Sequence, residues 1–326
     1  MIRVGPRNSI TDVPGIRVGN AEDHGLITGT TVIVPEEAAL CAVDHRGGAI
    51  GARDTIALMP GSVGGWVHAI CLSGGSAFGL DASGGVMDAL RQEGKGFAFG
   101  GTLVPIVPSA IIFDLMVGQP SWDTPPWWDL GKAAYLAATT DFALGNSGAG
   151  IGATAGDLKG GLGTASFRSD DYTLGALAVV NPVGSTVIPG SDTFWAWITE
   201  QDGELGGQTP PRAQPDILKA APWVGTPNTT LVVVATDADL DRDMALRLAI
   251  MAQDGIARAI NPVHSPMDGD TVFVLSTGQK DRPDPTRGLT KLGALAADAT
   301  SRAIARGVYE ADALAGIPSY LDRHGG

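Results

Sequence analysis

Four apolar runs bounded by turn residues constrain the fold of this 326-residue chain more than any other feature. They lie at residues 30–34, 175–181, 231–236 and 271–277. A strand with one face in water alternates apolar and polar residues, whereas a strand covered on both faces is apolar almost throughout. The runs therefore predict strands of sheets that are covered on both sides.

Helical periodicity marks two segments in the C-terminal third of the chain. In residues 240–260, Met244, Leu248 and Met251 share one face, and Asp239 is the expected N-cap. The same pattern returns further on, at Leu292, Ala296, Ala299 and Ala303. Earlier in the chain, the small residues of "CLSGGSAFGLDASGGVMDAL" predict a glycine-rich turn that enters a tightly packed helix.

Two stretches lack this periodicity. Residues 118–131 carry Trp122, Trp127 and Trp128 among prolines, and we interpret them as a loop, with a substrate-facing flap as the alternative. Residues 199–228 combine glycine, proline and polar residues, which indicates a surface linker. This linker leads directly into the third apolar run.

The charge of the chain limits its partners. The formal net charge is −13 and the sequence has no Lys/Arg cluster, whereas nucleic acids and anionic membranes bind concentrated positive charge. We therefore expect small molecules or peptides as partners, and neither nucleic acid nor a membrane. No segment has the apolar length of a signal peptide or a membrane span, so a cytoplasmic location is expected. Cys41 and Cys71 lie in apolar settings, which predicts buried free thiols.

Asn228, Thr229 and Thr230 stand where the linker meets the third apolar run. A hydroxyl needs a base before it can act as a nucleophile, and a residue's own α-amine is one compact base. If the Thr229 hydroxyl attacks the Asn228 carbonyl, an N-to-O acyl shift and ester hydrolysis leave Thr229 with a free amine. An α-amine ordinarily has a pKa of about 8, so it can serve as a general base and then as an acid. The alternative is a turn at Asn228 followed by two strand-forming residues.

Eight motifs spread along nearly the whole chain point together to one family. They are "NSITDVPGIRVGN", "AVDHRGGAIGARDT", "CLSGGSAFGLDASGG", "GGLGTAS", "VVNPVGS", "NTTLVVVATDA", "QDGIARAINPVH" and "MDGDTVFVLSTG". With them the chain resembles the DmpA-type peptidases, self-processing enzymes that include L-aminopeptidase/D-esterases, β-aminopeptidases and nylon-oligomer hydrolases.

The resemblance implies one α/β peptidase domain over residues 1–326 with a four-layer α/β/β/α sandwich. This fold is similar to that of the N-terminal-nucleophile hydrolases but differs in connectivity. The resemblance also implies cleavage before Thr229 into a long chain, residues 1–228, and a short chain, residues 229–326, that stay associated.

The resemblance assigns roles to further residues. Asn181, in "VVNPVGS", matches an asparagine whose amide stabilises the oxyanion; the alternative is an Asn-Pro turn. Asp268 and Asp270, in "MDGD", match an acidic pair that orients the nucleophile and its amine; the alternative is an Asp-Gly hairpin turn. Lys159 corresponds to a lysine beside the nucleophile, although it follows its "GATAG" motif later than in relatives, and it is otherwise a solvated turn residue. Phe113 stands where some relatives have a tyrosine, so that hydroxyl is absent here.

These observations predict a self-processed threonine hydrolase without a metal or organic cofactor. Its expected catalytic residues are Thr229, Asn181, Asp268, Asp270 and Lys159. The expected substrates are small peptides or amino-acid amides, cleaved at amide or ester bonds through an acyl-enzyme, with nylon-type oligoamides as secondary substrates. We expect a homo-oligomer of two-chain protomers. The rival classes are an acyltransferase of the ornithine-acetyltransferase type, whose own motif is not found in the sequence, and a non-catalytic ligand-binding relative.

Overall fold

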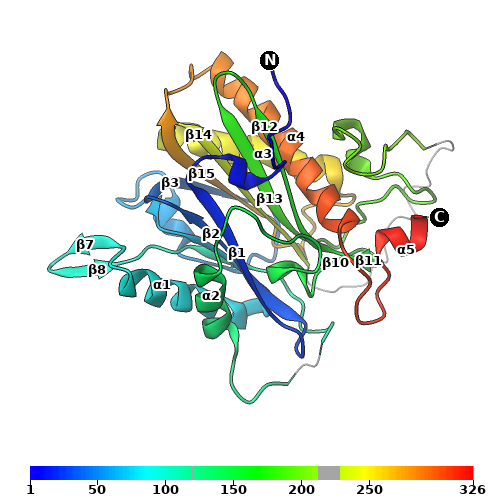
Figure 1. Ribbon diagram of the computed structural model, residues 1–326, viewed down its shortest axis with the longest axis horizontal. Helices are drawn as coiled ribbons and strands as arrows, with labels where there is room; N and C mark the ends of the chain where they lie inside the picture. Colours follow the sequence, from blue (N-terminus) through cyan, green and yellow to red (C-terminus); the bar gives the residue numbers. More distant parts are fainter. Residues whose placement is uncertain (119–120, 212–227, 326) are drawn as a thin grey trace.

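Two β-sheets lie face to face, and a pair of helices covers the outer side of each sheet (Figure 1). The computed structural model describes residues 1–118, 121–211 and 228–325. One sheet has six strands, in the order β12 (Gly161–Arg168), β13 (Thr173–Asn181), β14 (Thr229–Ala238), β15 (Thr271–Lys280), β3 (Ala39–His45) and β5 (Trp66–Val67). The other has five, in the order β1 (Ile16–Asp23), β2 (Thr28–Pro35), β6 (Ile70–Ser73), β9 (Ser109–Ile111) and β4 (Ala52–Arg53).

The helices divide between the two sheets. The five-stranded sheet is covered by α1 (Ala82–Gln92) and α2 (Trp127–Leu136), and the six-stranded sheet by α3 (Arg242–Ala259) and α4 (Arg287–Tyr309). The smaller elements are α5 (Tyr320–His324), the hairpins of β7 (Phe97–Phe99) with β8 (Thr102–Val104) and of β10 (Thr154–Ala155) with β11 (Leu158–Lys159), and the 3-10 helices η1 (Ile10–Asp12), η2 (Thr55–Leu58), η3 (Ser76–Asp81), η4 (Gly148–Gly150) and η5 (Trp195–Thr199).

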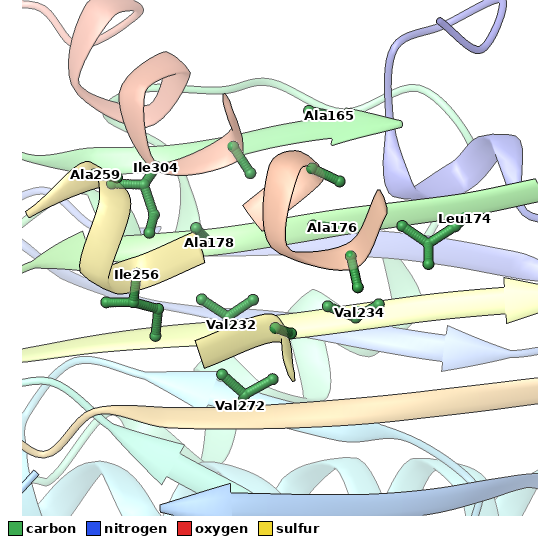
Figure 2. Packing of buried hydrophobic residues seen from close by; sticks show 14 of the residues in the cluster. Ala165, Leu174, Ala176, Ala178, Val232, Val234, Ile256, Ala259, Val272 and Ile304 are labelled. Atoms are coloured by element: carbon green, nitrogen blue, oxygen red, sulfur yellow. The ribbon is translucent and has the colours of Figure 1, made fainter. Parts of the chain in front are cut away.

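Three buried apolar layers hold the sheets and helices together. One lies between the six-stranded sheet and helices α3 and α4, one between the two sheets, and one under α1 and α2. In β14, Val232 and Val234 belong to the layer under the helices (Figure 2). Leu231, Val233 and Ala235, which alternate with them, belong to the layer between the sheets. Each fully buried valine or leucine contributes about 1.5–3 kcal/mol to folding.

This layering accounts for the apolar runs in the sequence. All four fall within strands, namely β2, β13, β14 and β15, and each strand sends side chains into two of the three layers. The prediction of doubly covered strands is therefore confirmed, as is the four-layer α/β/β/α fold. The two predicted C-terminal helices are α3 and α4, and the glycine-rich turn leads through η3 into α1.

The predicted N-cap of α3 is wrong by two residues. Asp241 caps the helix, because its side chain accepts a hydrogen bond of 2.9 Å from the Met244 amide. Asp239 instead forms an ion pair with Arg282, and its amide donates to the Lys280 carbonyl. Strand pairing thus holds Asp239 outside the helix, which the local sequence did not indicate.

The loop predicted for residues 118–131 is wrong from Trp127 onwards, because α2 begins there. Pro126 immediately precedes the helix, a place where the missing amide proton of proline costs little. Trp127 is fully buried and packs against Phe78 and Trp122, with ring centroids 5.9 and 4.8 Å away. Residues 119–120 lie outside the described residues.

The surface linker predicted for residues 199–228 is wrong for its first part. Leu205 is buried, and the adjacent Glu204 accepts hydrogen bonds of 2.5 and 2.8 Å from the buried guanidinium of Arg302 on α4. Breaking a buried ion pair on one side typically costs about 3–5 kcal/mol, so this contact anchors the segment to α4. The remainder of the predicted linker, residues 212–227, lies outside the described residues.

Both cysteines are free and buried, as predicted, and burial raises the pKa of each thiol. A buried thiol with a raised pKa is a poor nucleophile, so neither Cys41 nor Cys71 is a candidate for catalysis. Within residues 1–118, 121–211 and 228–325, no helix has both the length and the apolar character that crossing a bilayer requires.

Candidate active site

Three strands of the six-stranded sheet bring the candidate residues together. β14 begins at Thr229, which is paired with Asn181 at the end of the antiparallel strand β13. On its other side β14 runs parallel to β15, and Asp268 and Asp270 directly precede that strand. Asn228 forms a β-bridge with Asp268. Four candidate catalytic residues therefore meet at one end of the sheet.

The peptide group between Asn228 and Thr229 has its carbonyl oxygen held from two sides. The Thr229 hydroxyl donates to that oxygen over 2.5 Å, and the Gly269 amide donates to it over 2.9 Å. Two donors polarise a carbonyl and stabilise negative charge that develops on its oxygen. The Thr229 hydroxyl and the Gly269 amide thus both donate to the same carbonyl oxygen.

Gly269 lets the nucleophile come this close. A Cβ atom at this position would lie 2.7 Å from Thr229 Oγ1 and 2.8 Å from the Ala49 carbonyl oxygen. Both separations are shorter than side-chain carbons normally adopt, so any larger residue would displace the hydroxyl or the backbone. The glycine therefore serves a close approach rather than a turn.

Asp270 is buried and hydrogen-bonded through both side-chain oxygens. Oδ1 accepts from the Thr230 amide over 2.8 Å, while Oδ2 accepts from the His264 amide over 3.2 Å and lies 2.7 Å from His264 Nδ1. Thr230 directly follows Thr229. The carboxylate is therefore fixed beside the first residues of β14.

Asp268 belongs to the turn that precedes β15. Its amide donates to the Ser265 carbonyl over 3.1 Å, and its Oδ2 accepts from the Ser265 amide over 2.8 Å. Its Oδ1 accepts from the Val183 amide over 3.2 Å. Burial, and then the nearby charge of Asp270, raise the pKa of Asp268. The Asp-Gly hairpin alternative is wrong, since Gly269 does not adopt the left-handed backbone that such a turn requires.

The orientation of the Asn181 amide is fixed by a backbone donor. The Thr154 amide lies 2.8 Å from Oδ1 of Asn181, and because a backbone N–H can only donate, the oxygen must face it. Nδ2 then points to the Phe113 carbonyl oxygen at 3.3 Å and to Oδ1 of Asn228 at 3.5 Å. The structure thus presents an amide donor next to the side chain of Asn228.

Lys159 is not the solvated turn residue that the sequence left open. It is fully buried at the end of the β10–β11 hairpin, and its Nζ donates to the carbonyl oxygens of Gly150, Ala153 and Gly160 over 3.0, 2.8 and 2.8 Å. Burial lowers the pKa of Lys159 to about 7 and raises the pKa of the nearby buried Asp114 to about 6. With all three donors on backbone oxygens, Lys159 holds the segment that carries the Thr154 amide.

The free energy of unfolding should rise with pH above 7 in the parent, relative to a Lys159→Met variant. Between the lowered pKa of about 7 and the ordinary value of 10.5, the unfolded chain holds a proton that the folded protein has released. Stability rises with pH wherever the unfolded state binds more protons, and methionine has no such contribution. Urea unfolding of both proteins between about pH 8 and pH 10, above the pKa of Asp114, measures the difference. Parallel curves for the two proteins would show that Lys159 titrates normally.

Three further residues of the site were not found from the sequence. His264, Thr154 and Gly269 contact the candidate residues only because the sheet and its flanking turns fold together. The only local signal was the short spacing between His264 and the acidic pair in "VHSPMDGD". Within the described residues, no three His, Cys, Asp or Glu side chains are grouped so that they could hold a metal ion.

Comparison with known proteins decides the family. The model of peptidase family S58 matches residues 8–320. The chain belongs to this family. Among relatives of this S58 peptidase, an uncharacterized aminopeptidase of Mycobacterium tuberculosis is 44% identical, with 97% of both chains covered. The 6-aminohexanoate-oligomer endohydrolase of Paenarthrobacter ureafaciens is 34% identical over 88% of this chain and 82% of that enzyme.

Solved structures show the same fold. A β-aminopeptidase of Burkholderia sp. has a TM-score of 0.73 at 24% identity, covering 98% of this chain and 92% of the other. The L-aminopeptidase D-Ala-esterase/amidase of Ochrobactrum anthropi, a variant among the Ntn hydrolase fold, has a TM-score of 0.67 at 21% identity, covering 95% and 88%. The resemblance to the DmpA-type peptidases is thus confirmed, and this S58 peptidase is a hydrolase of peptide or amide bonds.

Proposed function

We propose that this S58 peptidase cleaves itself between Asn228 and Thr229, and that Thr229 then acts as an N-terminal nucleophile on small peptides or amino-acid amides. The observation that carries the proposal is the Thr229 hydroxyl, 2.5 Å from the carbonyl oxygen of the bond that would be cleaved. The products are a long chain, residues 1–228, and a short chain, residues 229–326.

Self-cleavage uses the Thr229 hydroxyl as nucleophile and the Gly269 amide as oxyanion donor. Oγ1 of Thr229 attacks the Asn228 carbonyl carbon, and the Gly269 amide stabilises the oxyanion. The C–N bond breaks and the hydroxyl proton passes to the departing nitrogen, which leaves an ester and a free amine. Water then hydrolyses the ester, so that Asn228 ends in a carboxylate and Thr229 recovers its hydroxyl.

Substrate hydrolysis repeats the same chemistry with a different base. The α-amine of Thr229 takes the hydroxyl proton as Oγ1 attacks the substrate carbonyl, and it returns the proton to the leaving amine. Nδ2 of Asn181 donates to the oxyanion. Asp268 and Asp270 hold the amine, and Lys159 supports the segment that orients Asn181. Water releases the acyl group and completes the cycle.

The proposed substrate class is defined by the amide bond that is cleaved, not by the side chains of the substrate. Relatives of the chain are named as aminopeptidases and as a hydrolase of 6-aminohexanoate oligomers, and their substrates share an amide linkage. We therefore propose amides and esters of amino acids and small peptides as primary substrates and nylon-type oligoamides as secondary ones. Acyl transfer to an amine is the alternative, and product analysis with an added amine acceptor distinguishes the two. The homo-oligomer and the cytoplasmic location stay predictions.

Intact-mass analysis of the purified protein is expected to find two chains in place of one. The smaller chain should begin Thr-Thr-Leu-Val-Val, because the hydroxyl, the polarised carbonyl and the start of β14 coincide at this bond. N-terminal sequencing of that chain checks the boundary. A single chain that persists through prolonged incubation at neutral pH would contradict self-cleavage.

A further inference from the structure

His264 contacts Asp270 through both its backbone amide and its ring. Its backbone has a φ of 54°, in the left-handed region that side chains rarely adopt. In this conformation its amide and its ring nitrogen Nδ1 both face the same oxygen, Oδ2 of Asp270, at 3.2 and 2.7 Å. The carboxylate only accepts hydrogen bonds, so Nδ1 carries the proton.

Among the residues that the structure describes, the Asp270 carboxylate has three hydrogen-bonding contacts, and His264 supplies two of them. The third comes from the Thr230 amide, 2.8 Å from the other oxygen, Oδ1. The Asp270 residue is 1% exposed, whereas the imidazole that covers its carboxylate is 23% exposed at the edge of the site. A chain of contacts therefore runs from the imidazole through Asp270 to the residue that follows the nucleophile.

We infer that His264 is a positioning residue for the nucleophile. This inference rests on the proposed function. It holds the Asp270 carboxylate against the start of β14, where that carboxylate can bind the α-amine of Thr229 after cleavage. Without the ring donor, Oδ2 keeps only the longer backbone contact, and the buried carboxylate is free to rotate away from the Thr230 amide. His264 acts through Asp270 and does not itself touch the reacting atoms.

Two variants separate the ring donor from the unusual backbone. His264→Asn keeps a side-chain N–H near the position of Nδ1, and asparagine tolerates the left-handed conformation. His264→Gly adopts this conformation more easily still but has no donor. If His264 served only the turn, the glycine variant would have a kcat equal to or higher than that of the parent.

We expect instead that kcat is highest in the parent, lower in His264→Asn and lowest in His264→Gly. A hydrogen bond to a charged group is worth about a tenfold to hundredfold change in rate, so His264→Gly should lower kcat by about tenfold or more and change KM much less. His264→Asn should restore most of the lost kcat. Self-cleavage, followed by intact mass over time, should slow in the same order. His264→Ala replaces the glycine variant if the latter does not fold.

The possible results separate this inference from the proposed function. A parent protein that remains one chain contradicts the proposed function, whatever the variants do. A parent that is processed, together with a His264→Gly variant of parental kcat, overturns only the positioning role. Equal losses in the asparagine and glycine variants would also overturn it, because a side-chain donor would then not be the property that matters.

Discussion

Replacing Thr229 by alanine is expected to give a folded protein that remains one chain and lacks hydrolytic activity. The substitution removes the oxygen atom that lies 2.5 Å from the carbonyl oxygen of Asn228. In the proposed mechanism this oxygen is the nucleophile both for self-cleavage and for turnover, so both should fail together. Loss of a catalytic nucleophile commonly lowers kcat by about 10⁴-fold or more. Thr229→Ser keeps a hydroxyl and should retain part of both activities.

The neighbouring residue provides a matched control. Thr230 is also fully buried at the start of β14, and its Oγ1 has no hydrogen-bond partner in the part of the chain that the structure describes. Valine has nearly the same shape and removes an unpaired hydroxyl, so Thr230→Val should fold and process itself like the parent. Intact mass and turnover of an amino-acid amide are measured for Thr229→Ala and for Thr230→Val. Full activity in Thr229→Ala would assign the nucleophile to another residue.

The fold was largely predictable because strands that are buried on both faces have almost entirely apolar sequences. Residues 231–235 are all apolar, since successive side chains of β14 enter different layers and no face meets water. The errors arose where tertiary contacts override local preference. Asp239 looked like a helix cap but is held by the end of β15, and Trp127 stood among prolines but begins a buried helix.

The site was predictable only in part. The sequence alone predicts that a strand starts at Thr229, whereas the roles of Asn181 and the acidic pair came from the family resemblance. Their proximity depends on pairing between β13, β14 and β15, which joins residues forty or more positions apart. No local pattern reports that register. The contact between His264 and Asp270 could not be predicted either, because it requires the turn before β15 to fold back on itself.

Asn181 is the residue for which an equally sharp test is available, because its two amide atoms have different partners. Oδ1 accepts from the Thr154 amide, and Nδ2 is the atom that can donate to a substrate oxyanion. Asn181→Asp keeps the acceptor and removes the donor, whereas Asn181→Ala removes both and leaves a backbone N–H without its partner. An unpaired buried N–H costs about 1–3 kcal/mol, so the alanine variant should lose stability. The aspartate variant should lose stability too, because it turns a buried carboxylate oxygen toward the oxygens of Phe113 and Asn228 that Nδ2 contacts in the parent.

Both variants should nevertheless lose turnover, with kcat lower by about a hundredfold or more, because one preorganised oxyanion donor is worth about 3 kcal/mol in the transition state. KM should change much less, since the donor acts mainly on charge that develops during the reaction. Self-cleavage should be slowed less than turnover, because the carbonyl oxygen of Asn228 accepts from the Gly269 amide, whereas Nδ2 of Asn181 lies 3.5 Å from the side chain of Asn228. Steady-state kinetics and the rate of chain cleavage are measured on the same preparations. An aspartate variant with parental kcat would show that Nδ2 is not the oxyanion donor, and equal loss of cleavage and turnover would mean that Asn181, rather than Gly269, governs both steps.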